Sequence, residues 1–462
     1  MNEWQTLTLA DVCTVITDGA HQSPKTVSRG KPMASVKDLT RFGVDLTSAR
    51  HIATEDFEAL VKQGCKPHVG DVLIAKDGNS ALDTVCTVDH PLDAVLLSSV
   101  AILRPDPKCL DSVFLKFYLS SPETIDYLKS NFISGAAIPR VVLRDFKRAE
   151  IRLPSLDVQR RIAGVLQSID SKIDLNRRVN QTLEAMAQAI FQSWFVDFDP
   201  VKAKIAAKAE GRDPLRAAMS VISGKAAAEL DALPPEQYEQ LAATAALFPD
   251  EMEDSELGAI PKGWTVCPLP ECVDINPSRV LKKGAIAPYL DMANVPTHAA
   301  RVDNVVPRAF GSGSKFINGD TLLARITPCL ENGKTAYVDF LADGEVGWGS
   351  TEFIVLRPKN GLPLPFAYFL CRHPEFRAFA ISQMAGTSGR QRVPNDCFGA
   401  YKVVKPSPLV ADAFGLQTTQ FMKQIKSLDE ASKTLAGLRD VLLPRLLSGE
   451  LQVQHTEPEA VA

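Results

Sequence analysis

The chain has 462 residues, of which 45% are hydrophobic and 23% are charged. This length suffices for roughly three or four domains, and the composition excludes a mostly disordered or collagen-like chain. No run of about 18 apolar residues is present, so no membrane span is expected, and the first residues show no basic and apolar secretory signal. The nine cysteines are scattered, with no C-x-x-C spacing. This pattern argues against a disulfide framework or a zinc ribbon and predicts a cytoplasmic protein with reduced thiols.

The net charge of −4 is distributed unevenly. Residues 199–256 hold 6 basic and 12 acidic side chains and predict an Ala-rich, acidic connector of short surface helices. The tail at 449–462 adds three more glutamates, so the rest of the chain carries +5. That excess is small beside the charge of domains that bind duplex DNA alone, which favours weak intrinsic affinity or binding with the help of a partner.

Short sequence matches recur about 250 residues apart, in the same order. Gly70-Asp71 corresponds to Gly319-Asp320, and Leu103-Arg104-Pro105 corresponds to Leu356-Arg357-Pro358. A period this long indicates two copies of a whole domain rather than a solenoid. We predict these copies at 1–153 (the first domain) and 257–405 (the second domain).

Each copy predicts a mixed α/β domain, because short β-rich runs are broken by Gly, Pro, Asp and Asn. The expected strands lie at 71–75, 95–103, 322–326 and 352–356, and the expected short helices lie at 113–119 and 366–371.

A long helix is predicted after each copy. The first opens at Ser155, a suitable N-cap, within a spacer segment at 154–198. The second opens at Pro408 and ends at Pro444, within a spacer segment at 406–448. At roughly 36–38 residues, each helix would be about 55 Å long.

Apolar positions alternately four and three residues apart mark a stripe along each helix. The pattern favours a coiled-coil pair over separate packing of each helix against its own domain. The stripe residues are Ile162, Leu166, Ile169, Ile173, Leu183, Ala187 and Ile190 in the first helix, and Phe421, Ile425, Leu428, Leu435, Leu438 and Leu442 in the second. Asn176 and Asn180 interrupt the first stripe, where they either set the register of the pair or face solvent.

No catalytic or metal-binding pattern is complete. Gly333-Lys334-Thr335 lacks the upstream glycine of a phosphate-binding loop, since Pro328 stands there. Pro105-Asp106 with Asp145-Phe146-Lys147 could form a nuclease pattern, but the second copy has no matching lysine. The histidines are dispersed, and neither H-E-x-x-H nor G-x-S-x-G occurs. We therefore predict no catalytic residues and no metal ligands.

Two polar, glycine-containing segments with arginines occupy matching places in the two copies. The candidate DNA-binding residues there are Arg140, Arg144, Lys147 and Arg148 in and after the segment 134–140, and Arg390, Gln391 and Arg392 in the segment 386–394. Arginine can bridge guanine or phosphate with two hydrogen bonds, and glutamine can do so to adenine. The alternative is a surface hairpin with solvated charges.

The chain resembles the specificity subunits of type I restriction-modification systems over nearly its whole length. The most specific stretch is Ile151–Ile162, and Trp194–Pro200 is similar to the end of the family's first spacer helix. Thr17–His21 resembles the opening of a first recognition domain, which adds His21 to the candidate DNA contacts. The segments Gly386–Val393 and Leu442–Glu450 are also typical of the family.

The resemblance implies an α+β protein in which two target-recognition domains are separated by two long antiparallel coiled-coil helices. It implies a non-catalytic subunit that binds double-stranded DNA, two methyltransferase subunits and restriction (motor-nuclease) subunits. No cofactor is expected in this chain, whereas S-adenosylmethionine, ATP and Mg²⁺ are expected in the partners. Because the two copies differ in their loops, the predicted target is an asymmetric, bipartite sequence. The alternatives are a protein-interaction scaffold and an inactive specificity determinant without DNA targeting.

Overall fold

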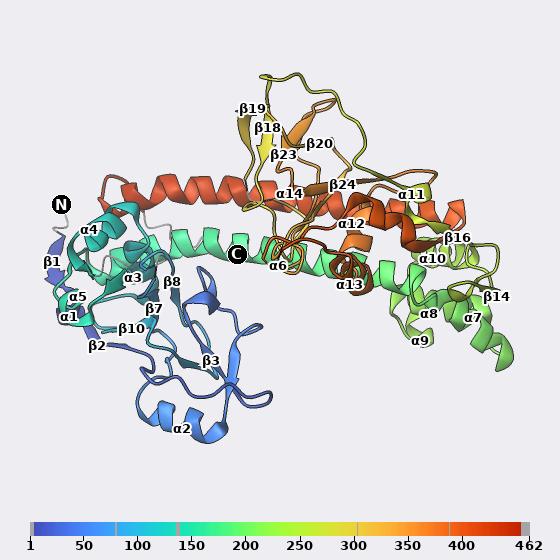
Figure 1. Cartoon of the computed structure of the whole chain (residues 1–462). Coiled ribbons are helices and arrows are strands. Elements are labelled where there is room, and N and C mark those ends of the chain that lie inside the picture. The colour runs from blue at the N-terminus through green and yellow to red at the C-terminus, as the bar shows by residue number, and fades with distance from the viewer. Residues whose placement is uncertain (1–3, 79–80, 135–138, 303, 388, 454–462) are drawn as a thin grey trace. The chain divides into compact units, whose positions relative to one another are not determined.

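The computed structural model describes residues 4–78, 81–134, 139–302, 304–387 and 389–453. The chain divides into two compact units (Figure 1). The first unit runs to Asn176 and resumes at Glu430, and the second comprises Arg177–Asp429. Both boundaries fall inside a long helix, α6 (Leu156–Phe195) or α14 (Pro408–Leu447). Each unit therefore combines one copy of the predicted domain with parts of both helices.

The first domain is built around a four-stranded antiparallel sheet of order β2-β10-β7-β8. Its strands are β1 (Gln5–Thr8), β2 (Cys13–Asp18), β3 (Lys31–Ala34), β4 (Leu39–Thr40), β5 (Gly43–Val44), β6 (Arg50–Ile52), β7 (Val72–Ala75), β8 (Val85–Thr87), β9 (Val95–Leu96), β10 (Val100–Pro105), β11 (Ile133–Ser134), β12 (Arg140–Val141) and β13 (Glu150–Leu153). Its helices are α1 (Leu9–Val12), α2 (Thr54–Lys62), α3 (Ser112–Leu119), α4 (Pro122–Phe132) and α5 (Leu143–Phe146), with a 3₁₀ turn at Val36–Asp38.

The second domain repeats this sheet in the order β17-β24-β21-β22. Its strands are β14 (Met252–Ser255), β15 (Gly258–Pro261), β16 (Thr265–Pro268), β17 (Val273–Ile275), β18 (Ile286–Leu290), β19 (Val306–Ala309), β20 (Ser314–Phe316), β21 (Thr321–Ala324), β22 (Thr335–Tyr337), β23 (Gly347–Gly349), β24 (Phe353–Pro358) and β25 (Lys402–Lys405). Its helices are α11 (Leu269–Cys272), α12 (Pro365–Arg372) and α13 (Pro374–Ser382), with a 3₁₀ turn at Asn395–Ala400.

The duplication extends beyond the central sheets. The pair β1/β13 recurs as β16/β25, and the smaller sheet β6-β3-β9 recurs as β19-β18-β23 with β20 added. In both smaller sheets one strand pair is parallel, β3/β9 or β18/β23. The strands β10 and β24 are buried throughout except at the arginine of their Leu-Arg-Pro motif, because the other side chains fill the domain cores. The predicted mixed α/β copies are confirmed.

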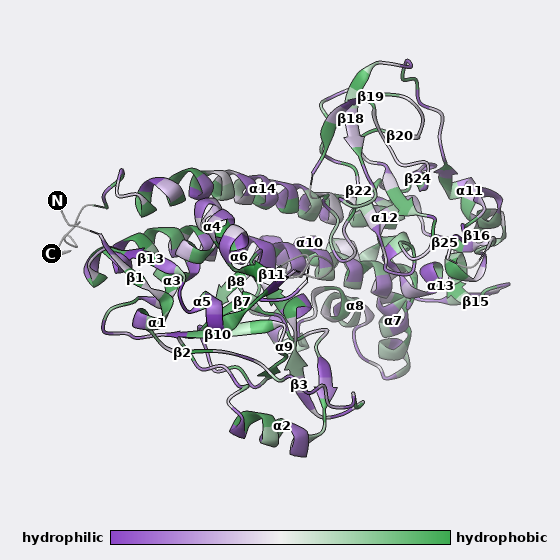
Figure 2. Cartoon of the chain, turned by 60° about the vertical axis from the view of Figure 1, so that its left-hand side comes forward, coloured by the Kyte–Doolittle hydropathy of each residue, from purple (hydrophilic) through white to green (hydrophobic). Residues whose placement is uncertain are grey.

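Within each unit the two long helices run antiparallel. In the first unit, Ile162 and Leu166 of α6 share one hydrophobic core with Leu443 and Leu446 of α14 and with the first domain. In the second unit, the ring centroids of Phe195 and Phe414 lie 4.8 Å apart, in a core that also includes the second domain. Figure 2 shows hydrophobic and hydrophilic residues alternating along both helices, as the heptad-like pattern requires.

The stripe predicted for α14 is wrong in its last third. Leu438 is 49% exposed, whereas the neighbouring Arg439 is buried together with Leu443 and Leu446. A charged side chain occupies a core position there, so counting apolar residues shifts the register by one. The predicted end at Pro444 is also wrong, because the helix continues to Leu447. In the last turn, a proline removes only one helical hydrogen bond.

The acidic connector folds as α7 (Asp199–Ala209), α8 (Pro214–Ser223), α9 (Ala227–Leu230) and α10 (Pro235–Ala246) in the second unit. These helices have a small core of their own, composed of Ala218, Met219, Leu230 and Ala245. Proline stands in the first turn of α7, α8 and α10, where its missing N–H costs no helical bond.

Candidate nucleic-acid interface

The residues of the repeated motifs pair with each other inside each domain. The fully buried carboxylate of Asp71 accepts hydrogen bonds from Nε and Nη2 of Arg104 at 2.7 and 2.8 Å. The equally buried Asp320 accepts one from Nη1 of Arg357 at 2.7 Å. Each aspartate also accepts a bond from the backbone N–H three residues before it. The Gly-Asp and Leu-Arg-Pro motifs are thus two halves of a structural ion pair that joins neighbouring strands.

Two predicted contacts of the first domain meet at the end of its central sheet where β2 and β7 end. His21 is exposed, and its Nε2 lies 3.1 Å from Oδ1 of Asp18. Asp18 also pairs with Lys76, which follows β7. The next residue, Asp77, accepts a hydrogen bond from Nε of Arg140 at 3.0 Å, and the Arg140 side chain is 62% exposed. His21 and Arg140 therefore belong to one network of alternating charges at this loop end. Residues 135–138 of the predicted segment lie outside the described residues.

The predicted contacts of the second domain lie at the corresponding end of its sheet. Arg392 donates from Nε and Nη2 to the carboxylate of Glu352 at 2.7–2.9 Å, and its side chain is 48% exposed. This fork fixes the guanidinium plane and leaves Nη1 to donate outward. Gln391 is held through its backbone, which exchanges hydrogen bonds with Thr327. Arg390 is exposed.

Arg140 and Arg392 occupy the same position in the two copies. Each forms an isolated β-bridge with the residue that follows a cation, Lys76 or Arg325. In each copy, the backbone N–H after the arginine donates to the carbonyl of that cation, at 3.0 and 2.9 Å. The carboxylate partners differ, however: that of Arg140 directly follows Lys76, whereas that of Arg392 precedes β24. Equivalent arginines are therefore oriented by different carboxylates.

Sequence reasoning missed Lys76 and Arg325, although a signal for them exists. Each follows the repeated aspartate by five residues, at the end of a buried strand. A cation at the same offset in both copies marks the loop end of the sheet.

Three other predicted DNA contacts do not join this network. The carbonyl of Lys147 accepts a hydrogen bond from the N–H of Ala10, which precedes β2, so Lys147 lies at the opposite end of that strand. Arg148 pairs with Asp145 at 2.6 Å. Arg144 lies 3.8 Å from Asp145, and its side chain is 89% exposed. A role for these three residues in DNA binding stays a prediction.

Among the predicted spacer residues, Ile162, Leu166, Leu183 and Ile425 are buried, and Ile169, Ile173, Leu428, Leu435 and Leu442 are half-buried. Both asparagines face the neighbouring helix. Asn176 is 1% exposed and donates from Nδ2 to Ser432 Oγ at 3.1 Å. Asn180 donates from Nδ2 to the carbonyl of Ile425 at 3.3 Å. These bonds favour the register role over the solvent-facing alternative.

A buried carboxylate on α6 attaches the first domain to the helices. Asp170 is fully buried and pairs with Lys116 of α3 at 2.9 Å, with Arg439 of α14 at 2.9 Å and with Arg41 at 3.1 Å. Burial alone would raise the pKa of Asp170, but the attraction of Lys116 and Arg41 outweighs it and lowers the pKa below its usual value.

The second unit holds its domain through Glu184 of α6. This carboxylate accepts hydrogen bonds from the Tyr368 hydroxyl and from the N–H of Ala300, the latter at 3.0 Å, and lies 3.5 Å from Nη2 of Arg372. Burial, with the nearby negative charge of Glu184, raises the pKa of Tyr368 well above its usual value. In both units an acid on α6, fully buried in the first and half-buried in the second, therefore fixes a domain to the helix.

The structure shows no nucleotide loop or metal site in the part of the chain that it describes. Lys334 donates to the carbonyls of Met292 and Ala293, so it supports the chain and is not the lysine of a phosphate loop. Over the same residues, no group of three His, Cys, Asp or Glu side chains could hold a metal ion, and no helix is long and apolar enough to span a membrane.

Comparison with known proteins agrees with this arrangement. A family model described as the type I restriction modification DNA specificity domain matches residues 1–185. The HindI specificity subunit of Haemophilus influenzae is 28% identical over 391 residues, which cover 79% of this chain and 83% of that protein. The MjaIX specificity subunit of Methanocaldococcus jannaschii is 23% identical over 354 residues, or 73% and 69% of the two chains. The crystal structure of the S subunit from M. genitalium has a TM-score of 0.51 at 16% identity, covers 98% of this chain and 97% of its own, and shares the fold.

The duplicated α/β domains and paired long helices are the fold that the chain shares with that S subunit. The chain is similar over most of its length to the specificity subunits of type I restriction-modification systems, as its sequence resemblance predicted. Members of this family are the non-catalytic DNA-recognition component of a multi-subunit complex.

Proposed function

We propose that the chain reads an asymmetric, bipartite DNA target, with each domain reading one part and an unread gap between the parts. The observation that carries this proposal is the pair Arg140 and Arg392. They stand at equivalent positions at the loop ends of duplicated sheets, yet different carboxylates orient them. Equivalent arginines with different surroundings would contact two different base sequences, since side-chain orientation decides which base edge is bridged. Two such domains suit half-sites about one DNA turn, roughly 34–36 Å, apart.

We further propose that the chain positions two methyltransferase subunits and the motor-nuclease subunits on this target. The methyltransferases would bring S-adenosylmethionine, and the motor-nuclease subunits would bring ATP and Mg²⁺. Both long helices carry exposed apolar side chains that a partner could cover: Leu175 and Met186 on α6, and Leu409, Leu416, Leu438 and Val441 on α14. Partner subunits would also supply phosphate contacts, which fits the small positive charge of the domains.

The proposal is tested by mapping adenine methylation across the genome of cells that carry the cognate methyltransferase, with and without this chain. A bipartite methylated motif that depends on the chain is the expected result. Arg140→Ala and Arg392→Ala should each relax one half of the motif and leave the other half intact. Equal relaxation of both halves by either variant would contradict the assignment of one half to each domain. Absence of any chain-dependent motif, with both proteins co-purifying, would favour a scaffold or an inactive specificity determinant.

A further inference from the structure

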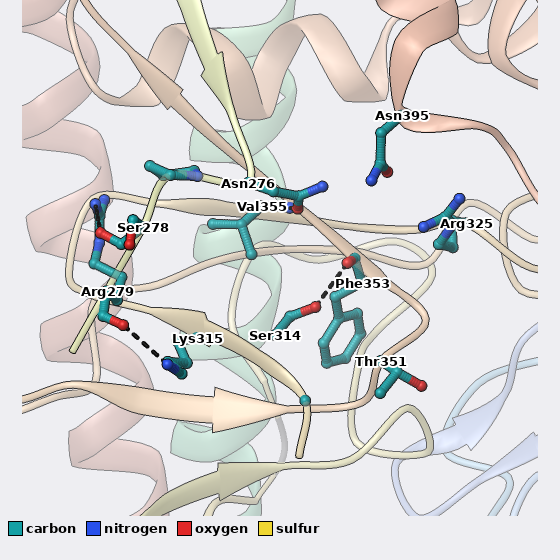
Figure 3. Close-up of a pocket in the computed structure, with 12 residues that line it drawn as sticks. Asn276, Ser278, Arg279, Ser314, Lys315, Arg325, Thr351, Phe353, Val355 and Asn395 are labelled. Carbon is teal, nitrogen blue, oxygen red and sulfur yellow. Dashed lines mark hydrogen bonds between the residues drawn. The ribbon is translucent and has the colours of Figure 1, made fainter. Parts of the chain in front are cut away.

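A polar pocket opens at the loop end of the second domain (Figure 3). It has a volume of about 370 Å³ and lies where β17 and β21 end and β24 begins. Its lining contains three cations, Arg279, Lys315 and Arg325, and no Asp or Glu. Figure 3 shows Arg279 and Lys315 at one side, Arg325 at the other, and Phe353 and Val355 between them.

The positive charge of this pocket is not balanced by the residues that the structure describes. The ammonium of Lys315 donates to the carbonyl of Arg279 at 3.0 Å and lies 5.2 Å from the centre of the Phe310 ring. Arg325 donates to the carbonyl of Val393 at 2.5 Å. Across the described part of the chain, no carboxylate lies within ion-pair distance of Lys315 or Arg325.

Arg279 adds to the excess. Its Nη2 lies 3.3 Å from Asp320, but that single carboxylate also serves Arg357. The Nε atoms of Arg279 and Arg325 are both buried and have no hydrogen-bond partner in the described residues. Buried donors are normally satisfied, so these two guanidinium N–H groups add to the uncompensated polarity beside the pocket.

The first domain lacks this arrangement, although it is built on the same sheet. The lysine five residues before the repeated aspartate is Lys66 there and Lys315 in the second domain, but Lys66 pairs with Asp93 at 3.2 Å. The counterpart of Arg325 is Lys76, which pairs with Asp18. The strand registers place Ala20 where the second domain has Arg279. The loop end of the first domain is therefore neutralised internally, and that of the second domain is not.

We propose that the pocket formed by Arg279, Lys315 and Arg325 binds a phosphate oxyanion, supplied by the DNA backbone of the half-site that the second domain reads. Arginine and lysine form strong, charge-assisted hydrogen bonds to phosphate oxygens. The pocket also lies at the same sheet end as Arg392, so a strand whose bases meet Arg392 would bring its phosphates there. This inference rests on the proposed function for its source of phosphate. It adds that the two domains hold DNA unequally, with salt-dependent affinity concentrated in the second.

The decisive experiment measures DNA affinity against salt concentration for the complete complex with the methyltransferase subunits. Lys315→Gln and Arg325→Gln should each lower the slope of log K against log salt by about 0.9, and weaken binding about fivefold at roughly 0.15 M salt. Lys66→Gln is the matched control, because it removes the equivalent lysine from the first domain, and it should leave the slope unchanged. Methylphosphonate substitution removes the charge of single phosphates along the second half-site. At one phosphate it should weaken DNA binding by the wild-type complex but not by the Lys315→Gln, Arg325→Gln double variant.

A second arm separates DNA phosphate from phosphate in solution. Inorganic phosphate should raise the melting temperature of the chain, and the double variant should lose this increase. Stabilisation by inorganic phosphate with unchanged salt slopes would assign the pocket to a free anion and overturn the DNA source. Unchanged salt slopes without stabilisation by inorganic phosphate would overturn the proposal that the pocket binds an anion. The melting measurement contains no DNA, so it tests anion binding in the pocket independently of DNA recognition. A complex that shows no specific DNA binding would refute the proposed function and leave the melting test of the pocket valid.

Discussion

Asp170→Asn tests whether a buried charge cluster holds the first domain on the long helices. The substitution keeps the shape of the side chain but removes the negative charge that Lys116, Arg41 and Arg439 share. Lys116 and Arg439 are almost fully buried, so they cannot regain solvation when the carboxylate is lost. The variant therefore removes the carboxylate that the structure gives to Lys116 and, among the described residues, leaves Arg439 with the exposed Asp440 alone.

The expected loss of folding stability follows from the burial of this ion-pair cluster. Removing one partner of a buried ion pair typically costs about 3–5 kcal/mol. Asp157→Asn on the same helix is the matched control, because Asp157 is exposed and, among the described residues, forms an ion pair with Arg161 alone, one turn away. An exposed helical pair of this kind contributes about 0.3–0.5 kcal/mol. The two variants should therefore differ severalfold in destabilisation.

Amide hydrogen exchange resolves this difference by segment. In Asp170→Asn, peptides from residues 112–119 and 156–176 should exchange about 100-fold faster or more, the equivalent of about 3 kcal/mol. Peptides from the second domain should exchange as in the wild type. The pKa of Asp170 is lowered in the folded chain, so its contribution is complete above the unfolded pKa of about 3.9 and is lost as the pH falls below it. The difference in stability between the Asp170→Asn and Asp157→Asn variants should therefore be the same at every pH from 5 to 8. Equal, small effects of Asp170→Asn and Asp157→Asn would refute the reasoning.

Four further outcomes are expected. Glu352→Gln loosens the fork on Arg392, so it should relax one half of the methylation motif less than Arg392→Ala does; an unchanged motif would contradict the orienting role. Asn176→Leu should raise calorimetric stability by about 1 kcal/mol, because an apolar side chain replaces a buried amide at a register position; a lower melting temperature would show that the amide stabilises the pair. Burial raises the pKa of Cys86 to about 12, so iodoacetamide at pH 8 should label it only after unfolding, and rapid labelling of the native chain would be inconsistent with its burial. Val441→Lys should abolish co-purification with the methyltransferase if the exposed apolar face of α14 binds it, and intact co-purification would exclude that residue from the contact.

The sequence was sufficient for the architecture because the relevant signals are local or repeated. Ordered matches such as Gly70-Asp71 with Gly319-Asp320 predicted two copies of one domain, and the copies share their strand order. The pairing of the aspartate in each match with the arginine of Leu-Arg-Pro explains why these short motifs are the ones that recur. The long helices were predictable from period alone, since a stripe of apolar side chains three and four residues apart needs no knowledge of the partner.

The sequence by itself thus determined the duplication, the long helices and the placement of arginines in matching loops. Tertiary structure decided which charges are satisfied. Arg439 takes the core position in place of Leu438 because Asp170, far away in sequence, pairs with it there in addition to the neighbouring Asp440. Lys66 and Lys315 are equivalent in sequence, yet only Lys66 has a carboxylate beside it among the residues described. Whether a charged side chain serves the fold or remains to bind a ligand depends on its neighbours in space, and the order of residues along the chain does not reveal them.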